Sequence, residues 1–404
     1  MTQKDFSSIY NSILASPFKS VSRLTFGGSD TLFIADWKES TIHAFTLPLA
    51  EHADDGKSYN LMNLDSILAQ TLNKSDFIIE DMVKRPKSNE VYIAISCGAH
   101  KIPAIIYIIP DGTARILNAE KLQHSSMKLD NAPDEKLTFW NHIPGRSFTV
   151  TDMKWRSGEL FVAGLSNQDF SSALWRLSYP FNGKSSTSSI EIYHAIHDQL
   201  ETRAPIRAMT FVELEGQPYL LAAYTCTPLV TIPLENLKDG AHIHGKTIAE
   251  LGYGNTPGTM ISYEISGADG KKIPYILLTN LNSNADVMSV VSIEEANKAP
   301  GLSSPPEHLT DAAGVKSVRA PLVGVLRIDN QNDQLFVILR RNIMSGKLEL
   351  ISMQKGHAMF RLSDFVTEYT MPTYSYTPGK QLNFFKPFQD NMKRSEGYAN
   401  LVSE

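Results

Sequence analysis

The feature that most constrains this chain is a unit of short strands that recurs six times. Each unit begins with a short strand, crosses a turn rich in Gly, Asp or Asn, and continues as a strongly apolar strand. A polar loop and a third strand follow. The third unit shows the pattern clearly, with strands expected over 150–155, 159–163 and 173–177. Short apolar runs bounded by turn residues indicate an all-β fold.

A regular spacing of these units favours a radial array, because each small sheet can bury its faces only against its neighbours. We therefore predict a β-propeller over 20–365, with six blades preferred and seven as the alternative. Either the N-terminal segment 1–19 or residues 357–365 should supply the last strand of the ring. A short helix is expected over 63–71, and the aromatic tail 366–404 should pack on the ring or cover a partner surface. The central strands are expected to start at residues 31, 91, 159, 219, 275 and 334.

The composition is that of an ordinary globular protein, with 42% apolar and 20% charged residues. A net charge of −5 provides no global basic field for nucleic acid or anionic lipid. The densest basic cluster, Lys84, Arg85 and Lys87, is interpreted as a solvated turn. No stretch approaches the roughly 20 apolar residues that cross a bilayer. The expected partner is a protein or a small molecule at the channel face, with no nucleic acid and no membrane span.

The two cysteines, Cys97 and Cys226, are too few for a disulfide scaffold. Both follow central strands, in units two and four, which are not adjacent in a six-membered ring. A disulfide requires Cα atoms within about 7 Å, so we predict two unbridged thiols. Cys226 is expected to be the more buried, because Leu229 and Val230 follow it closely.

Three segments resemble a group of bacterial, exported β-propeller proteins. They are Val162-Ala-Gly-Leu-Ser-Asn-Gln-Asp169, Ser189-Ile-Glu-Ile-Tyr-His194 and Tyr219-Leu-Leu-Ala-Ala-Tyr-Thr-Cys-Thr-Pro-Leu-Val230. The likeness covers about residues 20–353 and implies the fold and export, but no catalytic residues. Around Cys97 the chain departs from the group, which has a basic Ser-Arg-Gly-type loop there. At the level of fold alone, the repeat is similar to six-bladed lactonase and NHL-type propellers, and fold does not determine function.

The resemblance implies a periplasmic or secreted protein, and a cytoplasmic one is the alternative. The opening segment, 1–17, lacks the basic start and apolar run of a secretory signal. That observation is compatible with a cytosolic protein or with the mature form of an exported protein, from which the signal is absent.

Candidate ligand-binding residues gather on one expected face of the propeller. The loops between second and third strands share a face with the segments that lead into the first strands; we call it the loop face. Side chains that could hold a ligand there carry charge, amide groups or an aromatic ring. The candidate ligand-binding residues are Arg23, Asp36, Trp37, Asn167, Arg207, Asn282 and Arg340.

A metal site at the mouth of the channel is the second candidate. Asp81 and Asp152 occupy equivalent places in units two and three, directly before a methionine. With the Asn280 amide they could hold one hard divalent cation such as Ca²⁺, which favours several oxygen ligands. Cys226 is the candidate ligand for a softer metal. The alternative interpretation is that both aspartates satisfy backbone groups at strand starts and face channel water.

Two histidines on one strand form a weaker candidate. His242-Ile-His244 places two imidazoles on the same side of an outer strand, an arrangement that can bind Zn²⁺ or Cu²⁺. No third ligand lies nearby in the sequence, so an exposed sheet edge is the preferred interpretation.

Three classes of function follow from these candidates. The leading hypothesis is a non-catalytic binding or scaffold propeller that holds a protein or small ligand at the loop face. The alternative is a metal-assisted hydrolase or lactonase with Asp81, Asp152, Asn167 and Asn280 around one cation. The third is a copper or redox accessory protein that uses Cys226 and its neighbours. No complete set of nucleophile and base is visible in the sequence, which favours the first.

Overall fold

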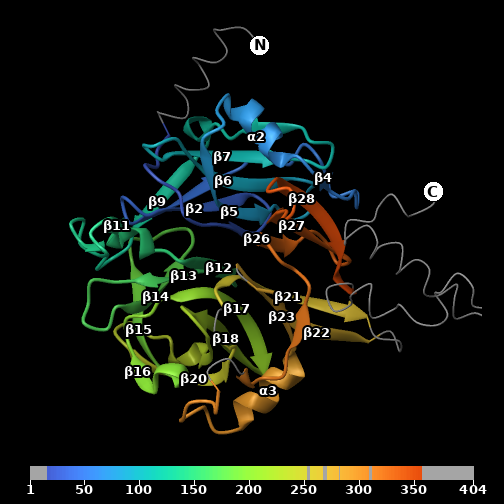
Figure 1. Ribbon diagram of the computed structural model, residues 1–404. Helices are drawn as coiled ribbons and strands as arrows, with labels where there is room; N and C mark the ends of the chain where they lie inside the picture. Colours follow the sequence, from blue (N-terminus) through green and yellow to red (C-terminus); the bar gives the residue numbers. More distant parts are fainter. Residues whose placement is uncertain (1–15, 253–254, 267–270, 282, 309–311, 357–404) are drawn as a thin grey trace, which may run out of the picture.

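The computed structural model describes residues 16–252, 255–266, 271–281, 283–308 and 312–356. These residues form an all-β propeller built from six four-stranded sheets, and two of the six join edge to edge into one larger sheet. Figure 1 shows these sheets arranged in a ring. The fold predicted from the repeats is therefore confirmed, and the preferred count of six blades describes the sheets observed.

The innermost and second strands of each blade follow the predicted units closely. The innermost strands are β1 (Leu24–Gly27), β5 (Phe77–Lys84), β12 (Asp152–Arg156), β17 (Ile206–Leu214), β21 (Pro257–Ser266) and β26 (Val325–Asn330). The second strands are β2 (Thr31–Asp36), β6 (Val91–Cys97), β13 (Glu159–Leu165), β18 (Gln217–Tyr224), β22 (Lys272–Asn280) and β27 (Leu335–Arg341).

The outer strands complete each antiparallel sheet. The third strands are β3 (Thr41–Thr46), β7 (Ile102–Ile108), β14 (Ser172–Ser178), β19 (Pro228–Pro233), β23 (Ala285–Ser289) and β28 (Leu348–Gln354). The fourth strands, in the same order of blades, are β9 (His124–Lys128), β8 (Ala114–Ile116), β15 (Ser185–His194), β20 (His242–Glu250), β25 (Val318–Ala320) and β4 (Asn60–Leu61).

Short elements fill the connections. The helices are α2 (Leu64–Leu72), which confirms the helix expected over 63–71, and α3 (Val290–Lys298). The remaining strands are β10 (Thr138–Phe139), β11 (Ile143–Pro144), β16 (Gln199–Glu201) and β24 (Ala313–Gly314), and the 3₁₀ turns are η1 (Ala119–Lys121), η2 (Gly145–Phe148), η3 (Ala195–His197) and η4 (Leu234–Asn236). Among the described residues, no helix has the length and apolar character needed to span a membrane.

The order of the blades around the ring differs from their order along the chain. Six apolar clusters each join two neighbouring blades, and they connect the units in the order six, two, one, three, four, five and back to six. Alternate residues of one central strand serve two clusters: Leu32 and Ile34 face unit two, whereas Phe33 and Ala35 face unit three. The chain therefore leaves unit one, builds unit two on one side of it, and returns to build unit three on the other.

Two fourth strands come from a part of the chain outside the unit that they complete. The fourth strand of unit one, β9, follows unit two in the sequence and pairs antiparallel with β3. The fourth strand of unit six, β4, comes from the connection between units one and two and pairs with β28. The expectation that segment 1–19 or 357–365 would occupy this last position is therefore wrong for the described sheet. Residues 357–404, including the aromatic tail, lie outside the described residues.

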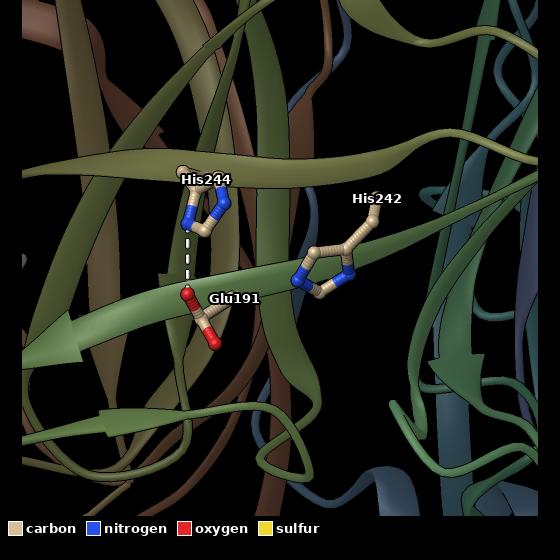
Figure 2. Close-up of side chains that lie close together, drawn as sticks. All are labelled: Glu191, His242 and His244. Carbon is tan, nitrogen blue, oxygen red and sulfur yellow. Dashed lines mark ion pairs between the residues drawn. The ribbon is translucent and has the colours of Figure 1, made fainter.

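Units three and four are joined by a strand pair. Their outermost strands, β15 and β20, run parallel from Ser189 opposite His242 to Ile192 opposite Gly245. Because side chains alternate along a strand, Glu191 and His244 meet on one side of this pair (Figure 2). We call this pairing the seam.

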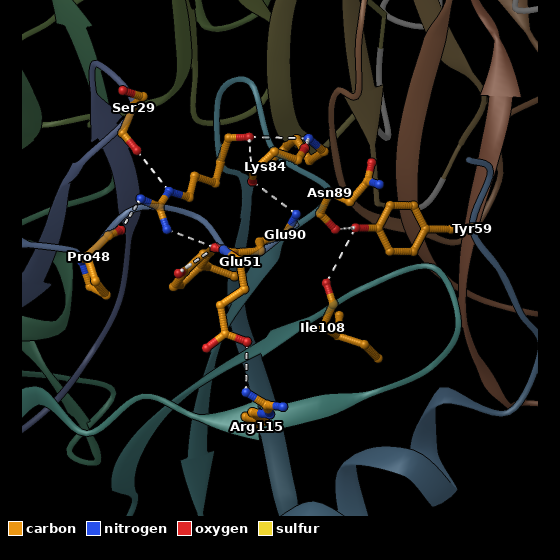
Figure 3. Close-up of polar contacts among 12 residues, drawn as sticks. Ser29, Pro48, Glu51, Tyr59, Lys84, Asn89, Glu90, Ile108 and Arg115 are labelled. Atoms are coloured by element: carbon orange, nitrogen blue, oxygen red, sulfur yellow. Dashed lines mark hydrogen bonds and ion pairs between the residues drawn. The ribbon is translucent and has the colours of Figure 1, made fainter. Parts of the chain in front are cut away.

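Tyr59 is buried where units two and six meet. The Tyr59 hydroxyl lies beside β4 and donates hydrogen bonds to the carbonyl oxygens of Asn89 and Ile108 in unit two (Figure 3). The same apolar cluster joins Tyr59 to strands of units two and six. A residue of the connecting segment thus contacts both unit two and unit six where these blades meet.

Lys84 and Arg85 are buried, which corrects the expectation of a solvated turn for these two residues, whereas Lys87 is exposed as expected. Arg85 pairs with Glu90 at 2.9 Å and donates to the carbonyl oxygens of Ser29 and Pro48 in unit one (Figure 3). Arg85 can be buried because its charge is satisfied by a carboxylate and by backbone oxygens of the neighbouring blade. It is a joint between blades one and two.

Candidate functional site

The centre of the ring holds a small polar cavity. It has a volume of about 200 Å³ and is lined by residues of the inner strands, among them Asp81, Asp152 and Arg23. Two further charged residues, Arg327 and Asp329, line it from unit six. The two aspartates that the repeats placed at the channel do lie there.

Asp81 is bonded on both carboxylate oxygens. One oxygen accepts from Nε of Arg327 at 2.5 Å, and the other accepts the backbone N–H of Leu24 at 2.8 Å. Leu24 belongs to unit one and Arg327 to unit six, the two ring neighbours of unit two. Asp81 therefore ties three consecutive blades together.

Asp152 repeats this arrangement between units three and four. Its oxygens accept the backbone N–H groups of Met209 at 2.8 Å and of Met153 at 2.9 Å. Lys154 Nζ lies 3.7 Å away. Asp329, which the sequence pattern did not reveal, does the same between units six and two by accepting from the Lys84 N–H at 2.9 Å. The available signal was its position on the inner strand two residues after Arg327.

Arginines fill the space between these carboxylates. Arg23 donates to the carbonyl oxygens of Thr151 at 2.6 Å and Ser22 at 2.7 Å. Burial and the nearby Arg327 lower the pKa of Arg23 to about 10. Burial and the charge of Arg327 also lower the pKa of Arg207. The carboxylates that line the cavity are thus matched by the cationic side chains of Arg23, Lys154 and Arg327, which compete with a bound cation.

Asp36 closes a turn on the loop face. It is fully buried and accepts the backbone N–H of Lys19 at 2.5 Å, the Ser20 hydroxyl at 2.5 Å and the Lys38 N–H at 3.1 Å. The next residue, Trp37, is half-buried, with Lys38 Nζ 5.6 Å from its ring centre. Asp36 thus holds the residues before β1 against the turn between β2 and β3.

Two other predicted ligand-binding residues, Asn167 and Arg340, lie on separate blades. Asn167 is exposed in the loop between β13 and β14. Nε of Arg340 pairs with Glu349 at 2.7 Å, which is buried beside it. Asn282 lies outside the described residues. Asn167 in unit three and Arg340 in unit six lie on opposite sides of the ring and do not share a site.

Asn280 lies at the end of β22 and does not line the central cavity. Its amide donates to Asp286 at 3.1 Å and to the carbonyl oxygen of Asn284 at 3.0 Å. Asp286 in turn pairs with Nε of Arg319 at 3.1 Å, and burial raises the pKa of its carboxyl group. The proposed grouping of Asn280 with Asp81 and Asp152 around one cation is therefore not the arrangement observed.

Both cysteines are free thiols, and their burial is the reverse of the expectation. Cys97 is buried, whereas Cys226 is half-exposed. Cys226 lies in a turn with a φ of 75°, so the chain bends outward before Leu229 and Val230 enter the core. The ring places units two and four on opposite sides, which separates the two thiols.

Cys226 neighbours a histidine held by carboxylates. His194 Nδ1 lies 3.0 Å from Glu201, whose oxygen also meets His197 Nδ1 at 2.6 Å. Burial alone would lower the pKa of His194, but hydrogen bonds to Cys226 and Glu201 raise it to about 9. The two nitrogens of His194 therefore face Glu201 and the Thr227 hydroxyl inside the protein.

A hairpin on the loop face carries an unusual tryptophan. Strands β10 and β11 pair through Phe139 and Ile143, and Trp140 in the turn between them is 78% exposed. Its φ of 47° is in the left-handed region, where a bulky side chain is an outlier. His142 Nδ1 contacts the Trp140 carbonyl oxygen at 2.6 Å and steadies this conformation.

The hairpin is anchored to the body of the ring. Arg146 donates to the carbonyl oxygens of Lys38 at 2.8 Å and Pro133 at 3.0 Å. Phe139 packs edge-on against Phe148. Trp140 is thus presented to solvent by a braced turn, next to the loop that carries Trp37. The sequence pattern did not single out this residue, because it lies in a segment that has the composition of a polar loop.

The comparisons with known proteins give only distant likenesses. No protein-family model matches the chain, and no curated protein sequence matches it. A solved structure of Drosophila Semaphorin 1b, extracellular domains 1–2, aligns with 9% identity over 84% of this chain and 87% of that one, with a TM-score of 0.35. Drosophila Plexin A in complex with Semaphorin 1b aligns with 8% identity over 83% and 84%, with a TM-score of 0.37. The architecture described above rests on the sheets of this chain itself.

Proposed function

We propose that this protein is a non-catalytic binding propeller that holds a protein partner on its loop face. The observation that carries the proposal is Trp140, 78% exposed at the tip of a braced hairpin in a backbone conformation that disfavours bulky residues. Unfavourable conformations of this kind persist where surrounding structure imposes them, and they cluster at functional sites. Tryptophan is also among the residues most enriched at the energetic centres of protein interfaces.

Other exposed apolar side chains support the choice of face. Ile343 and Met344, 71% and 90% exposed, lie in the loop between β27 and β28 on the same side of the ring. Phe170 lies in the equivalent loop of unit three and is 44% exposed. A partner with an extended apolar surface would contact several of these loops together.

The bonding of the channel disfavours the hydrolase alternative. The carboxylates of Asp81 and Asp152 already accept backbone N–H groups, and Arg23 and Arg327 lie among them. A hard cation would need to displace these bonds and to approach two arginines. We propose that the aspartates hold the blades together instead.

The test compares two exposed apolar residues on opposite faces. Trp140→Ser removes the proposed anchor, and Leu49→Ser, at a residue 93% exposed after β3 on the other face, is the matched control. Partners are captured by chemical crosslinking in cells of the source organism, and binding of the purified partner is then titrated.

A central interface residue costs about 2 kcal/mol or more on truncation, so Trp140→Ser should weaken binding by about 30-fold or more. Leu49→Ser should bind like the wild type. Equal affinity of the Trp140 variant and the wild type would exclude this hairpin as the anchor. Divalent-metal-dependent hydrolysis that is lost in Asp152→Asn would favour the enzyme alternative.

Export is the second part of the proposal. It is supported by the resemblance of three segments to exported bacterial propellers. Fractionation of the source cells would test it, since recovery of the protein with cytoplasmic markers alone would exclude export.

A further inference from the structure

The seam between units three and four brings together three metal-ligating side chains. Glu191 on β15 stands opposite His244 on the parallel strand β20, and His242 lies two residues earlier on the same side. Both imidazoles are exposed, as expected, but this part of β20 is not a free sheet edge, because His242–Gly245 pairs with β15. The third ligand absent from the local sequence comes from a strand about fifty residues earlier.

The donor atoms of this trio converge. One nitrogen from each imidazole and one Glu191 oxygen all lie within 4.8 Å of one another. His244 Nδ1 is 2.7 Å from the Glu191 carboxylate, and the two imidazole rings are 5.3 Å apart (Figure 2). Zinc bonds of about 2.1 Å place tetrahedral ligands about 3.4 Å apart, so small side-chain rotations bring the trio to coordination distance.

The side chains differ in exposure in a way that suits ion entry. The Glu191 side chain is 13% exposed, whereas that of His244 is 74% exposed. His242 contacts the Ser189 hydroxyl through Nδ1 at 2.8 Å and packs its ring 4.1 Å from that of Phe170. These contacts orient His242 and leave Nε2 as its second nitrogen. A buried carboxylate below two solvent-facing imidazoles is open to an ion from solvent.

The strands that carry the trio are held closely together. A Cβ atom on Gly245 would lie 2.6 Å from Val230 Cγ1 and 3.4 Å from Ile192 Cγ2. The missing side chain therefore lets β20 pack tightly between β15 and β19. Ligands fixed on paired strands vary less in position than ligands on loops.

We propose that Glu191, His242 and His244 bind a divalent transition metal of the zinc class, with the remaining positions taken by water or by a partner's side chain. Two imidazoles and one carboxylate suit Zn²⁺, Cu²⁺ or Ni²⁺ better than Ca²⁺ or Mg²⁺, which take mainly oxygen ligands. The ion joins strands of two blades, so its binding tightens the seam. This proposal is independent of the function proposed for the loop face.

A second cluster in the described part of the chain provides the control. His194, His197 and Glu201 also place their donor atoms within 4.8 Å of one another. There, however, Glu201 lies 3.0 Å from the buried His194 and 2.6 Å from His197, and His194 Nε2 also meets the Thr227 hydroxyl at 3.2 Å. Both nitrogens of His194 thus face internal groups, and its side chain is only 1% exposed, unlike the imidazoles of His242 and His244.

The experiment titrates Zn²⁺ into the untagged, chelator-treated full chain at pH 7.5 by isothermal calorimetry. We expect one site per chain. The double variant His242→Ala/His244→Ala should weaken binding by about 100-fold or more, since even indirect partners of a metal ligand contribute about 10- to 100-fold. The isosteric variant Glu191→Gln should also weaken it, and His197→Ala should not. Ca²⁺ and Mg²⁺ at the same concentration should give no comparable heat.

Three results would overturn the proposal. They are no Zn²⁺ binding by the wild type up to 1 mM (~10⁻³ M, a weak-binding limit), unchanged binding in the double variant, and loss of binding in His197→Ala. A thermal unfolding series is the second readout, because an ion that binds only the folded chain raises the melting temperature. Zn²⁺ should raise that of the wild type and of His197→Ala, and chelator should reverse the shift. The Glu191→Gln variant keeps its side-chain shape and so remains informative if the double variant unfolds.

Discussion

The inner strands carry three aspartates, Asp81, Asp152 and Asp329, which we call the inner belt, and the outer seam carries Glu191. The carboxylates differ in whether backbone groups of the protein already occupy them. In the channel, Asp81, Asp152 and Asp329 each accept a backbone N–H from a neighbouring blade. At the seam, the Glu191 carboxylate meets an imidazole that is 74% exposed. Buried charges persist only where hydrogen bonds satisfy them, so the belt has become part of the scaffold. The seam, close to water, keeps donor atoms that a ligand can use.

The largest loss in the free energy of unfolding should come from removing an aspartate of the inner belt. Asp81→Ala leaves the guanidinium of Arg327 and the Leu24 N–H without their partner. Removing one member of a buried pair costs about 3–5 kcal/mol, and urea denaturation would measure this loss in the free energy of unfolding.

The matched control for the belt is Glu213→Ala. Glu213 is 55% exposed and pairs with Arg156 at 2.7 Å on the surface, so its loss should cost under about 1 kcal/mol. Equal destabilisation by the two variants would remove the distinction between belt and surface.

The next largest effect is the contribution of His194 to the pH dependence of stability. Its pKa is raised to about 9 from 6.5, so its stabilising contribution is complete below pH 6.5 and disappears as pH rises through 9. Allowing for solvent screening, the stability difference between wild type and His194→Gln should shrink by about 1–2 kcal/mol between pH 6.5 and 9.5. Denaturation at stepped pH measures it.

His43 should show the opposite sign and so serves as the comparison. Burial lowers the pKa of His43 to about 4 from 6.5. Its unfolded form binds a proton that the native form excludes, so stability falls as pH falls from 6.5 towards 4. The difference between wild type and His43→Gln should therefore shrink on acidification. The same pH trend for both histidines would contradict the assigned environments.

A smaller loss of stability is expected at Tyr59, where units two and six meet. Tyr59→Phe removes a hydroxyl that donates to the Asn89 and Ile108 carbonyl oxygens and keeps the ring in its apolar cluster. Loss of a buried hydrogen bond with both acceptors left behind costs about 1–2 kcal/mol. Tyr193→Phe, whose hydroxyl bonds the exposed Asp198, should change the unfolding midpoint less. A neutral Tyr59→Phe would show that the hydroxyl does not hold the closure.

The smallest effect concerns reactivity rather than stability. Half-exposed Cys226 should react with a thiol reagent in the native protein, whereas buried Cys97 should react only after denaturation. Burial also raises the pKa of the Cys97 thiol, which slows its reaction further. Cys226→Ser should abolish labelling of the native protein. Two thiols that react at one rate would show that their environments do not differ.

Much of the fold could be predicted from local pattern. The second strands begin at Thr31, Val91, Glu159, Gln217, Lys272 and Leu335, within three residues of the predicted starts. Runs of consecutive apolar residues such as Leu32 and Phe33 already indicate that both faces of each sheet are buried. Asp81 and Asp152 could also be placed at the channel, because equivalent positions in the repeats occupy equivalent places in the ring.

The candidate sites were less predictable. Each polar residue could be assigned to a strand or a loop, but not to the partner that satisfies it. Asp36 was expected to bind a ligand, and the backbone N–H groups of Lys19 and Lys38 occupy it instead. The sequence did not predict the role of Trp140, because its exposure and its φ depend on the contacts that hold its hairpin against the ring.

The sequence by itself determined the second strands, the blades and the channel positions of Asp81 and Asp152, because strand alternation and turn chemistry act over a few residues. Only the tertiary structure decided that unit two sits between units six and one, that β4 closes unit six, and that Glu191 meets His244. These pairings join residues far apart in the chain through connections of no fixed shape. They form because each apolar face must be covered by some neighbour, and the local pattern does not specify which one.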